Sequence, residues 1–280
     1  MSGILYVVAT PIGNLEDITF RAVRTLREVA VIAAEDTRRT ARLLQHYSIS
    51  TPTTSLHEHN ETARIPALLA RLGAGDAVAL VSDAGTPSIA DPGARLVSAA
   101  HAAGYRVVPI PGPSAAIAAI SASGLSAEQI LFAGFPPSRS SARKRWFQKL
   151  RDEQRLIVLY EAPHRIRQSL EDLAAELGDR TVAVGRELTK LHEELVVRPL
   201  SDCLKELTTP RGEYTVVIAP PVSPNSAAAP LPGAPALAAE FGTMTENSRG
   251  SRRDAVRRLA EKYGISTREM YTLLESAREL

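Results

Sequence analysis

Four short segments combine small residues with carboxylates, hydroxyls and prolines. Small residues let backbone amides and carbonyls approach a ligand, and a neighbouring carboxylate accepts hydrogen bonds from ribose hydroxyls. The segments are Thr10-Pro11-Ile12-Gly13-Asn14, Glu35-Asp36-Thr37, Ser82-Asp83-Ala84-Gly85-Thr86-Pro87 and Pro111-Gly112-Pro113-Ser114. A single loop of this kind is explained as an ordinary turn between a strand and a helix. Here, however, four such loops each follow an expected strand. Four together predict a small-ligand site at one edge of a parallel sheet.

Acidic and basic residues follow two further expected strands in the second half of the chain. These groups are Tyr160-Glu161-Ala162-Pro163-His164-Arg165 and Arg186-Glu187-Leu188-Thr189-Lys190. A carboxylate there, or a lysine whose pKa is lowered, could accept a proton from a substrate. Glu187 and Lys190 could equally form a plain ion pair. Both interpretations stay open on the sequence.

Other common chemistries find little support. Gly73-Ala74-Gly75 supplies two glycines of a dinucleotide-binding loop, but Val78 stands in the third position and the motif precedes a strand. A Walker A loop and a GxSxG elbow are absent from the sequence. His57-Glu58-His59 offers metal-binding side chains at a spacing that signals a site only weakly, so we expect no metal. Cys203 is the single cysteine, which excludes disulfide and iron-sulfur chemistry.

The composition is that of a globular protein. The chain has 280 residues, of which 44% are hydrophobic and 23% charged, enough for about two domains. No apolar run approaches the length of a membrane helix and no signal peptide is recognisable, so we expect a cytoplasmic protein without a membrane partner. The net charge is only +2, but basic residues gather in three places. These clusters either form solvated helix faces or bind a polyanion.

Periodicity predicts an α/β fold of two domains. In residues 1–112, β-branched runs at 5–10, 29–34, 53–56, 77–82 and 106–110 alternate with helical patterns, which indicates a parallel sheet. Asp91 is expected to cap one of these helices, with Pro92 in its first turn. In residues 113–220, strands at 156–160, 181–184, 194–198 and 214–219 surround one clear helix from Ile166, so several neighbours should be antiparallel.

The end of the chain differs in composition. Residues 221–247 are rich in Pro and Ala and are expected to form a linker. In the tail, 248–280, the segments 252–263 and 267–279 read as two short helices around Gly264, similar to a helix-turn-helix. So small a unit is expected to dock or to order on a partner.

Several long motifs resemble one known family. They are TPIGNLEDIT (10–19), AAEDTR (33–38), LHEHNE (56–61), VSDAGTPSIADPG (81–93), PIPGPSA (109–115), GFPP (134–137), YEAPHR (160–165) and RELTK (186–190). Their order over about residues 4–219 resembles the ribosomal RNA small-subunit methyltransferase I branch of the tetrapyrrole methylase superfamily. The loops Pro-Ile-Gly-Asn and Ser-Asp-Ala-Gly depart from the GxGPG-like and GDP loops of the tetrapyrrole enzymes, which favours the RNA branch.

The resemblance implies an S-adenosylmethionine-dependent enzyme, a homodimer, that 2′-O-methylates a cytidine (cytidine 1402 in standard rRNA numbering) at the decoding site of 16S rRNA in the small ribosomal subunit. It implies the two-domain tetrapyrrole-methylase fold, a parallel-sheet domain and a mixed-sheet domain plus the helical tail, with the cofactor between the domains. The cofactor residues carried over are Pro11, Gly13, Ser82, Asp83, Ala84, Gly85, Thr86, Pro111, Gly112, Ser114 and Tyr160.

Two further sets of residues complete the expected site. A ribose hydroxyl is a poor nucleophile, so its proton must be removed, and we expect Glu187 or Lys190, with Asp36 or Glu161 nearby, to accept or orient it. Arg143, Lys144 and Arg145, together with Arg252, Arg253 and Arg257, are expected to contact RNA phosphates. Two rival functions remain: a small-molecule tetrapyrrole C-methyltransferase, and a ribosome-assembly factor that binds RNA without chemistry.

Overall fold

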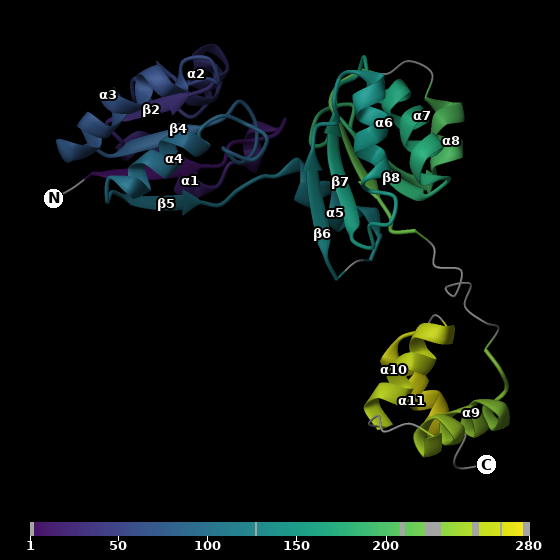
Figure 1. Ribbon diagram of the computed structural model, residues 1–280. Coiled ribbons are helices and arrows are strands. Elements are labelled where there is room, and N and C mark those ends of the chain that lie inside the picture. The colour runs from purple at the N-terminus through teal and green to yellow at the C-terminus, as the bar shows by residue number, and fades with distance from the viewer. Residues whose placement is uncertain are drawn as a thin grey trace. The chain divides into compact units, whose positions relative to one another are not determined.

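The computed structural model describes residues 3–126, 128–207, 211–221, 231–247, 252–263 and 265–276. The chain divides into two compact units, residues 1–220 and 221–280. Figure 1 shows that the first unit contains two separate sheets, each covered by helices.

The first sheet is fully parallel, with strand order β3-β2-β4-β1-β5. Its inner strands β2 and β4 are buried along their whole length, because helices cover both faces. Helices α1 and α2 pack on one face and α3 and α4 on the other. The strands are β1 (Ile4–Val8), β2 (Val31–Ala34), β3 (Thr53–Ser55), β4 (Val78–Val81) and β5 (Arg106–Ile110). The helices are α1 (Phe20–Glu28), α2 (Thr37–His46), α3 (Glu61–Gly73) and α4 (Ala94–Ala102), and a short 3-10 turn covers Leu15–Asp17.

The second sheet is mixed, in the order β6-β7-β10-β8-β9, and only β6 and β7 run parallel within it. Helix α5 packs on one face, while α6, α7 and α8 share the core on the other. The strands are β6 (Ile130–Gly134), β7 (Leu156–Glu161), β8 (Thr181–Arg186), β9 (Glu194–Pro199) and β10 (Tyr214–Ile218). The helices are α5 (Ala115–Ser123), α6 (Ser140–Gln148), α7 (Ile166–Leu177) and α8 (Leu200–Glu206).

The structure adds elements that the sequence analysis did not predict. Strand β6 is a part-exposed edge strand whose register shifts between Phe132 and Gly134. Helix α6 is rich in basic residues, so the sequence does not show which side of the helix is buried. Helix α8 is short and follows Pro199 directly.

The expected helix cap at Asp91 is wrong. Helix α4 begins at Ala94 after Gly93, whose left-handed φ of 119° suits glycine. The carboxylate of Glu61, on α3, caps the helix instead, because its Oε1 accepts the backbone N–H groups of Gly93, Arg95 and Leu96 at 3.1–3.2 Å. Asp91 therefore does not cap this helix.

In the part of the second unit that the structure describes there are three helices, whereas the sequence predicted two. They are α9 (Ala234–Asn247), α10 (Arg252–Tyr263) and α11 (Thr267–Ser276). Leu237 and Phe241 of α9 pack against Val256 and Leu259 of α10 and Met270 of α11. The linker predicted over 221–247 is therefore wrong from residue 234 onward, because an alanine-rich helix gains its stability from tertiary packing that composition does not reveal. Residues 222–230 and Gly264 lie outside the described residues.

No helix within the described residues is long and apolar enough to cross a membrane. The same residues contain no group of three or more His, Cys, Asp or Glu side chains placed to hold a metal ion.

Candidate active site

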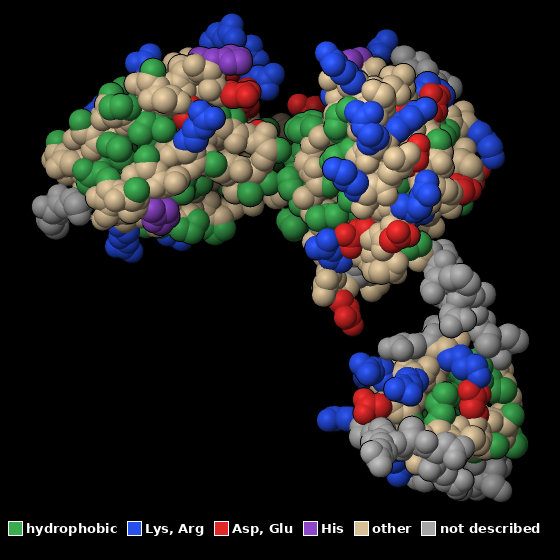
Figure 2. Space-filling view, in the orientation of Figure 1, with side chains coloured by type: hydrophobic (Ala, Val, Ile, Leu, Met, Phe, Trp, Pro, Cys, Tyr) green, Lys and Arg blue, Asp and Glu red, His purple; other side chains and the backbone are tan. Residues whose placement is uncertain are grey.

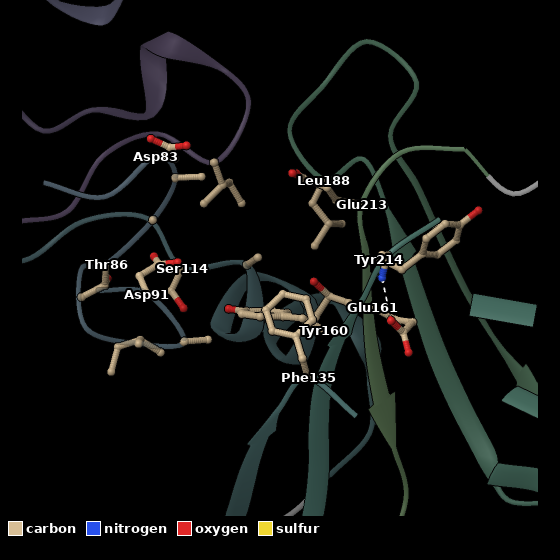
Figure 3. Close-up of a pocket in the computed structure, with 18 of the residues that line it drawn as sticks. Asp83, Thr86, Asp91, Ser114, Phe135, Tyr160, Glu161, Leu188, Glu213 and Tyr214 are labelled. Carbon is tan, nitrogen blue, oxygen red and sulfur yellow. Dashed lines mark hydrogen bonds between the residues drawn. The ribbon is translucent and has the colours of Figure 1, made fainter. Parts of the chain in front are cut away.

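A cavity of about 430 Å³ lies in the first unit, where loops from both sheets meet. Figure 3 shows Asp83, Thr86, Asp91 and Ser114 on one side of it, with Phe135 and Tyr160 facing them. The first side is built at the carboxyl ends of parallel strands, where the sequence placed a ligand. Its lining is Ile12, Glu35, Arg39, Asp83, Ala84, Gly85, Thr86, Ile89, Ala90, Asp91, Ser114, Ala115, Phe135, Tyr160, Glu161, Ala162, Pro163, Leu188, Lys190, Glu213, Tyr214 and Thr215.

The loops of the parallel sheet hold one another in place. The Thr10 and Gly85 backbones exchange hydrogen bonds at 2.8 and 3.0 Å, which ties the loop after β1 to the loop after β4. Thr86 Oγ1 donates to the Pro113 carbonyl at 3.3 Å, which ties in the loop after β5. Gly112 sits against Ala9, where an added Cβ would lie 3.0 Å from the Ala9 Cβ. The wall is therefore a preformed backbone surface.

The expected cofactor residues divide into two groups around this cavity. Asp83, Ala84, Gly85, Thr86, Ser114 and Tyr160 line it directly. Pro11, Gly13, Ser82, Pro111 and Gly112 are not among its lining residues. Ser82 is buried behind the wall, where the Thr10 hydroxyl donates to its carbonyl at 3.2 Å. Ile12 lines the cavity although the sequence analysis did not select it.

Tyr160 and Phe135 give the opposite side an aromatic surface. Their ring centroids are 5.6 Å apart. The Tyr160 hydroxyl accepts the Ala116 N–H at 3.2 Å and points toward the loops that carry Asp91 and Ser114 (Figure 3). Burial is the main reason that the pKa of Tyr160 lies above its ordinary value, so this phenol stays protonated at neutral pH.

One end of the cavity is closed by a contact between the two halves of the unit. The backbone N–H of Asn14 donates to Thr189 Oγ1 at 3.0 Å. Gly13 lies so close to this loop that an added Cβ would be 2.8 Å from Thr189 Oγ1 and would overlap Lys190 Cγ. Glu187 and Thr189 both have left-handed φ angles, 49° and 67°, a strained conformation for residues with side chains. Gly13 therefore does not line the cavity but lets its loop come close to the loop of Thr189 and Lys190.

Glu187 and Lys190 form an ion pair, one of the two alternatives that the sequence left open. Lys190 Nζ lies 2.8 Å from Glu187 Oε1 and 2.9 Å from Glu213 Oε2. Burial alone would lower the pKa of Lys190, but the hydrogen bonds to the two carboxylates outweigh it and raise that pKa. The hydrogen bond from Lys190 lowers the pKa of Glu187. Neither group has the pKa of an efficient proton acceptor at neutral pH.

The remaining expected acids also have other partners. Glu161 has a fully buried side chain, which pairs with Arg165 at 3.1 Å and also accepts hydrogen bonds from the Ala162 N–H and the Ser169 hydroxyl. Asp36 caps α2, and its hydrogen bonds with Arg38 lower its pKa to about 2. Both carboxylates thus serve structural contacts, and of the two Glu161 also lines the cavity.

Three carboxylates that line the cavity were not selected as site residues: Glu35, Asp91 and Glu213, of which Glu213 holds Lys190. Asp91 has its pKa raised to about 6, first by burial and then by the charge of Glu35, while a hydrogen bond with Ser82 opposes the change. Burial likewise raises the pKa of Glu35. Both residues lie inside motifs that the sequence analysis quoted, but Asp91 was explained there as a helix cap.

The residues expected to bind RNA are not equivalent. Arg143 is wrong as an RNA contact: its side chain is 0% exposed, and its Nε donates to Asp172 at 2.8 Å. Lys144 is about half exposed and lies 3.6 Å from the same carboxylate, and Arg145 is exposed. In the second unit, Arg252, Arg253 and Arg257 are exposed on α10. Blue side chains gather over these helices in Figure 2.

The chain is similar in sequence to a family of known proteins. The family model for Tetrapyrrole (Corrin/Porphyrin) Methylases matches residues 4–204. A Synechocystis sp. protein named "Ribosomal RNA small subunit methyltransferase I" is 52% identical over 220 residues, which cover 78% of this chain and 79% of that protein. A Pseudomonas aeruginosa protein of the same name is 43% identical over 267 residues, 88% of this chain and 95% of its own length.

Solved structures share the fold at low sequence identity. The methyltransferase CobJ superposes with a TM-score of 0.60 at 21% identity, covering 83% of this chain and 98% of that one. Uroporphyrin-III C-methyl transferase from Thermus thermophilus, solved with S-adenosyl homocysteine, gives a TM-score of 0.55 at 18% identity, covering 78% and 97%. The chain belongs to the tetrapyrrole methylase superfamily and, within it, to the ribosomal RNA small subunit methyltransferase I family of S-adenosylmethionine-dependent methyltransferases.

Proposed function

We propose that this enzyme transfers the methyl group of S-adenosylmethionine to the 2′-hydroxyl of a cytidine, cytidine 1402, at the decoding site of 16S rRNA in the small ribosomal subunit. The observation that carries the proposal is the extent of similarity to relatives named for small-subunit rRNA methylation. Residues of the motifs 81–93, 109–115, 160–165 and 186–190 line one cavity. Low-identity structural neighbours that act on tetrapyrroles support the fold alone.

The residues around the cavity fit the cofactor. The volume of about 430 Å³ lies within the range of small-molecule sites, roughly 300–1,000 Å³. Backbone and hydroxyl groups at Ala84, Gly85, Thr86 and Ser114 would hold polar parts of the cofactor, and Tyr160 offers an aromatic face. When bound, S-adenosylmethionine supplies an electrophilic methyl group on a positively charged sulfur. Pro11, Gly13, Ser82, Pro111 and Gly112 act indirectly, by shaping the loops that form the wall.

The ion-pair network of Lys190, Glu187 and Glu213 orients the ribose hydroxyl in this proposal. A protonated lysine held by two carboxylates is a fixed hydrogen-bond donor, and alignment of a nucleophile supplies a large part of such rate enhancements. Replacement of Lys190 by Ala should lower the single-turnover rate at saturating cofactor, whereas Lys190→Arg should retain more of it. An unchanged rate in Lys190→Ala and Glu187→Gln would remove both residues from the mechanism.

RNA binding is assigned to exposed basic residues on two helices. Lys144 and Arg145 on α6 and Arg252, Arg253 and Arg257 on α10 would neutralise phosphates and release counterions. Replacing each set by Ala should weaken RNA binding and reduce its salt dependence, while cofactor affinity stays unchanged. Arg71→Ala is the matched control, since Arg71 pairs with Asp76 before β4, away from the cavity. An equal salt slope in all variants would exclude these surfaces.

We also propose that the enzyme acts in the cytoplasm as a homodimer. Almost fully exposed apolar side chains at Phe20 (95%) and Leu191 (93%) support a further protein contact. Light scattering of the purified protein tests this: a mass of twice 30.1 kDa is expected, and a monomer at all micromolar concentrations would contradict it.

The choice of substrate class is tested by offering labelled S-adenosylmethionine with three acceptors in parallel. These are small ribosomal subunits that lack the modification, naked 16S rRNA, and a reduced porphyrin precursor. Label in either RNA sample supports the proposal and identifies the preferred form of the substrate. Label in the porphyrin alone would establish the small-molecule function, and tight RNA binding without transfer would indicate an assembly factor.

A further inference from the structure

One wall of the cofactor cavity carries three carboxylates whose charge is only partly balanced. Glu35, Asp83 and Asp91 all come from loops at the carboxyl edge of the parallel sheet and all line the cavity. Their hydrogen-bond donors are mainly backbone groups or hydroxyls: the Asp36 N–H donates to Asp83 at 2.9 Å and the Asp83 N–H to Glu35 at 3.2 Å. Such donors stabilise a carboxylate but do not cancel its charge.

The basic residues that line the cavity do little to offset this charge. Among the described lining residues these are Arg39 and Lys190. Arg39 approaches Asp83 at 3.4 Å, but its side chain is 63% exposed, so solvent screens the pair. Lys190 is already held between Glu187 and Glu213 across the cavity. The cavity therefore keeps an excess of negative charge beside its aromatic wall.

At Asp91, burial is the largest cause of the raised pKa, and the nearby charges of Glu35 and Asp83 add to it. Tyr160 faces Asp91 from β7, and the pKa of its phenol is raised first by burial and also by the charge of Asp91. A cation placed among these groups would relieve the repulsion. The cofactor and the spent cofactor differ in this respect, because S-adenosylmethionine carries a sulfonium charge and S-adenosylhomocysteine has a neutral thioether.

We propose that the acidic wall of Glu35, Asp83 and Asp91 distinguishes the two forms of the cofactor by charge, binding the sulfonium form preferentially and releasing the neutral product. This assigns to Asp91 a specificity-determining role that needs no RNA substrate. It also accounts for a costly cluster of part-buried carboxylates, two of which lie in a loop where two non-glycine residues, Ser88 and Ala90, adopt left-handed φ angles of 68° and 63°.

The size of the effect follows from linkage. A bound cation increases the acid dissociation constant of Asp91 by some factor. By linkage, ionisation of Asp91 tightens binding of that cation by the same factor. If binding returned this pKa from about 6 to its ordinary value of 3.8, affinity for S-adenosylmethionine would fall about tenfold between about pH 8 and about pH 5. Affinity for S-adenosylhomocysteine would change much less.

The test is calorimetric titration of the full-length protein with three ligands: S-adenosylmethionine, S-adenosylhomocysteine, and sinefungin, in which a protonated amine replaces the sulfonium. At about pH 8, Asp91→Asn should weaken both cationic ligands by about a hundredfold, the full factor that corresponds to a pKa of about 6 returning to 3.8, and change the neutral one by less than about twofold. Asp76→Asn is the matched control, since Asp76 pairs with Arg71 before β4 and should leave all three affinities unchanged.

A second measurement uses the unaltered protein, so that it does not depend on folding of the variant. Titrations near pH 6 in buffers of different ionisation enthalpy count the protons released on binding. Net release with the cationic ligands, but not with S-adenosylhomocysteine, supports the proposal. Equal proton release for all three ligands, or an equal loss of affinity for all three in Asp91→Asn, would overturn it.

Discussion

Replacement of Gly13 by Ala should open the closed end of the cavity. Gly13 does not have a left-handed φ angle, so Ala is compatible with the backbone there and the cost arises from contact alone. The new Cβ would lie 2.8 Å from Thr189 Oγ1 and 3.1 Å from the Leu188 carbonyl, and it would overlap Lys190 Cγ. Overpacking of this kind costs about 1–3 kcal/mol.

The partner of this contact can be identified by a double-mutant cycle. Lys190→Ala removes the Cγ that the new Cβ would meet, so the double variant should be more stable than the sum of the two single changes predicts, by at least about 1 kcal/mol. The assay is urea unfolding of the full chain followed by the fluorescence of Trp146, the single tryptophan, which lies on α6 in the first unit.

The control for this cycle is Gly242→Ala. Gly242 lies in α9 with nothing within 4 Å of an added Cβ, so this change should leave the Trp146 transition unaltered. Strictly additive free energies for Gly13→Ala and Lys190→Ala would refute the reasoning, because they would mean that the two loops do not meet in solution.

Three further outcomes are expected. Arg143→Ala should destabilise the first unit by about 3–5 kcal/mol in the same unfolding assay, because it leaves the Asp172 carboxylate buried without its partner, and it should not change the salt dependence of RNA binding. Leu237→Ala should cost the second unit about 2–5 kcal/mol, measured as faster amide exchange in α10, with the Trp146 transition unchanged. Asp91→Asn should raise stability above about pH 6 by about 1 kcal/mol, a value reduced for partial solvent exposure, and have no effect below about pH 3, where the carboxyl is protonated in both folded and unfolded states; urea unfolding across this pH range measures it.

The strands and loops of the parallel sheet could be predicted because their signals are local. Strands β2 and β4 are buried on both faces and appear in the sequence as continuous apolar runs. The residues that follow them are types typical of turns. The family motifs then placed the cofactor at these loops.

The elements that were missed depend on tertiary contacts. Arg143 looks like a surface charge in the sequence, but Asp172, 29 residues later, pairs with it inside the protein and conceals the amphipathic character of α6. Helix α9 contains many small residues, and its apolar side becomes buried only by packing against Val256, Leu259 and Met270. Composition cannot report such pairings.

The site residues show the same limit. Lys190 was weighed as a proton acceptor because it follows a strand, but Glu213, from another part of the chain, holds it as a cation. Asp91 precedes a proline in a pattern typical of helix starts, whereas Glu61 provides the cap and leaves Asp91 facing the cavity. Which carboxylate faces the ligand is decided by packing among loops that are distant in sequence.

The most direct test of the proposed function is the identity of the methylated nucleoside. Small subunits lacking the modification are incubated with the enzyme and labelled S-adenosylmethionine, the RNA is digested to nucleosides, and the labelled product is identified by mass spectrometry. The account predicts 2′-O-methylcytidine as the labelled product. A base-methylated nucleoside, or no transfer by a protein that binds the cofactor, would contradict it.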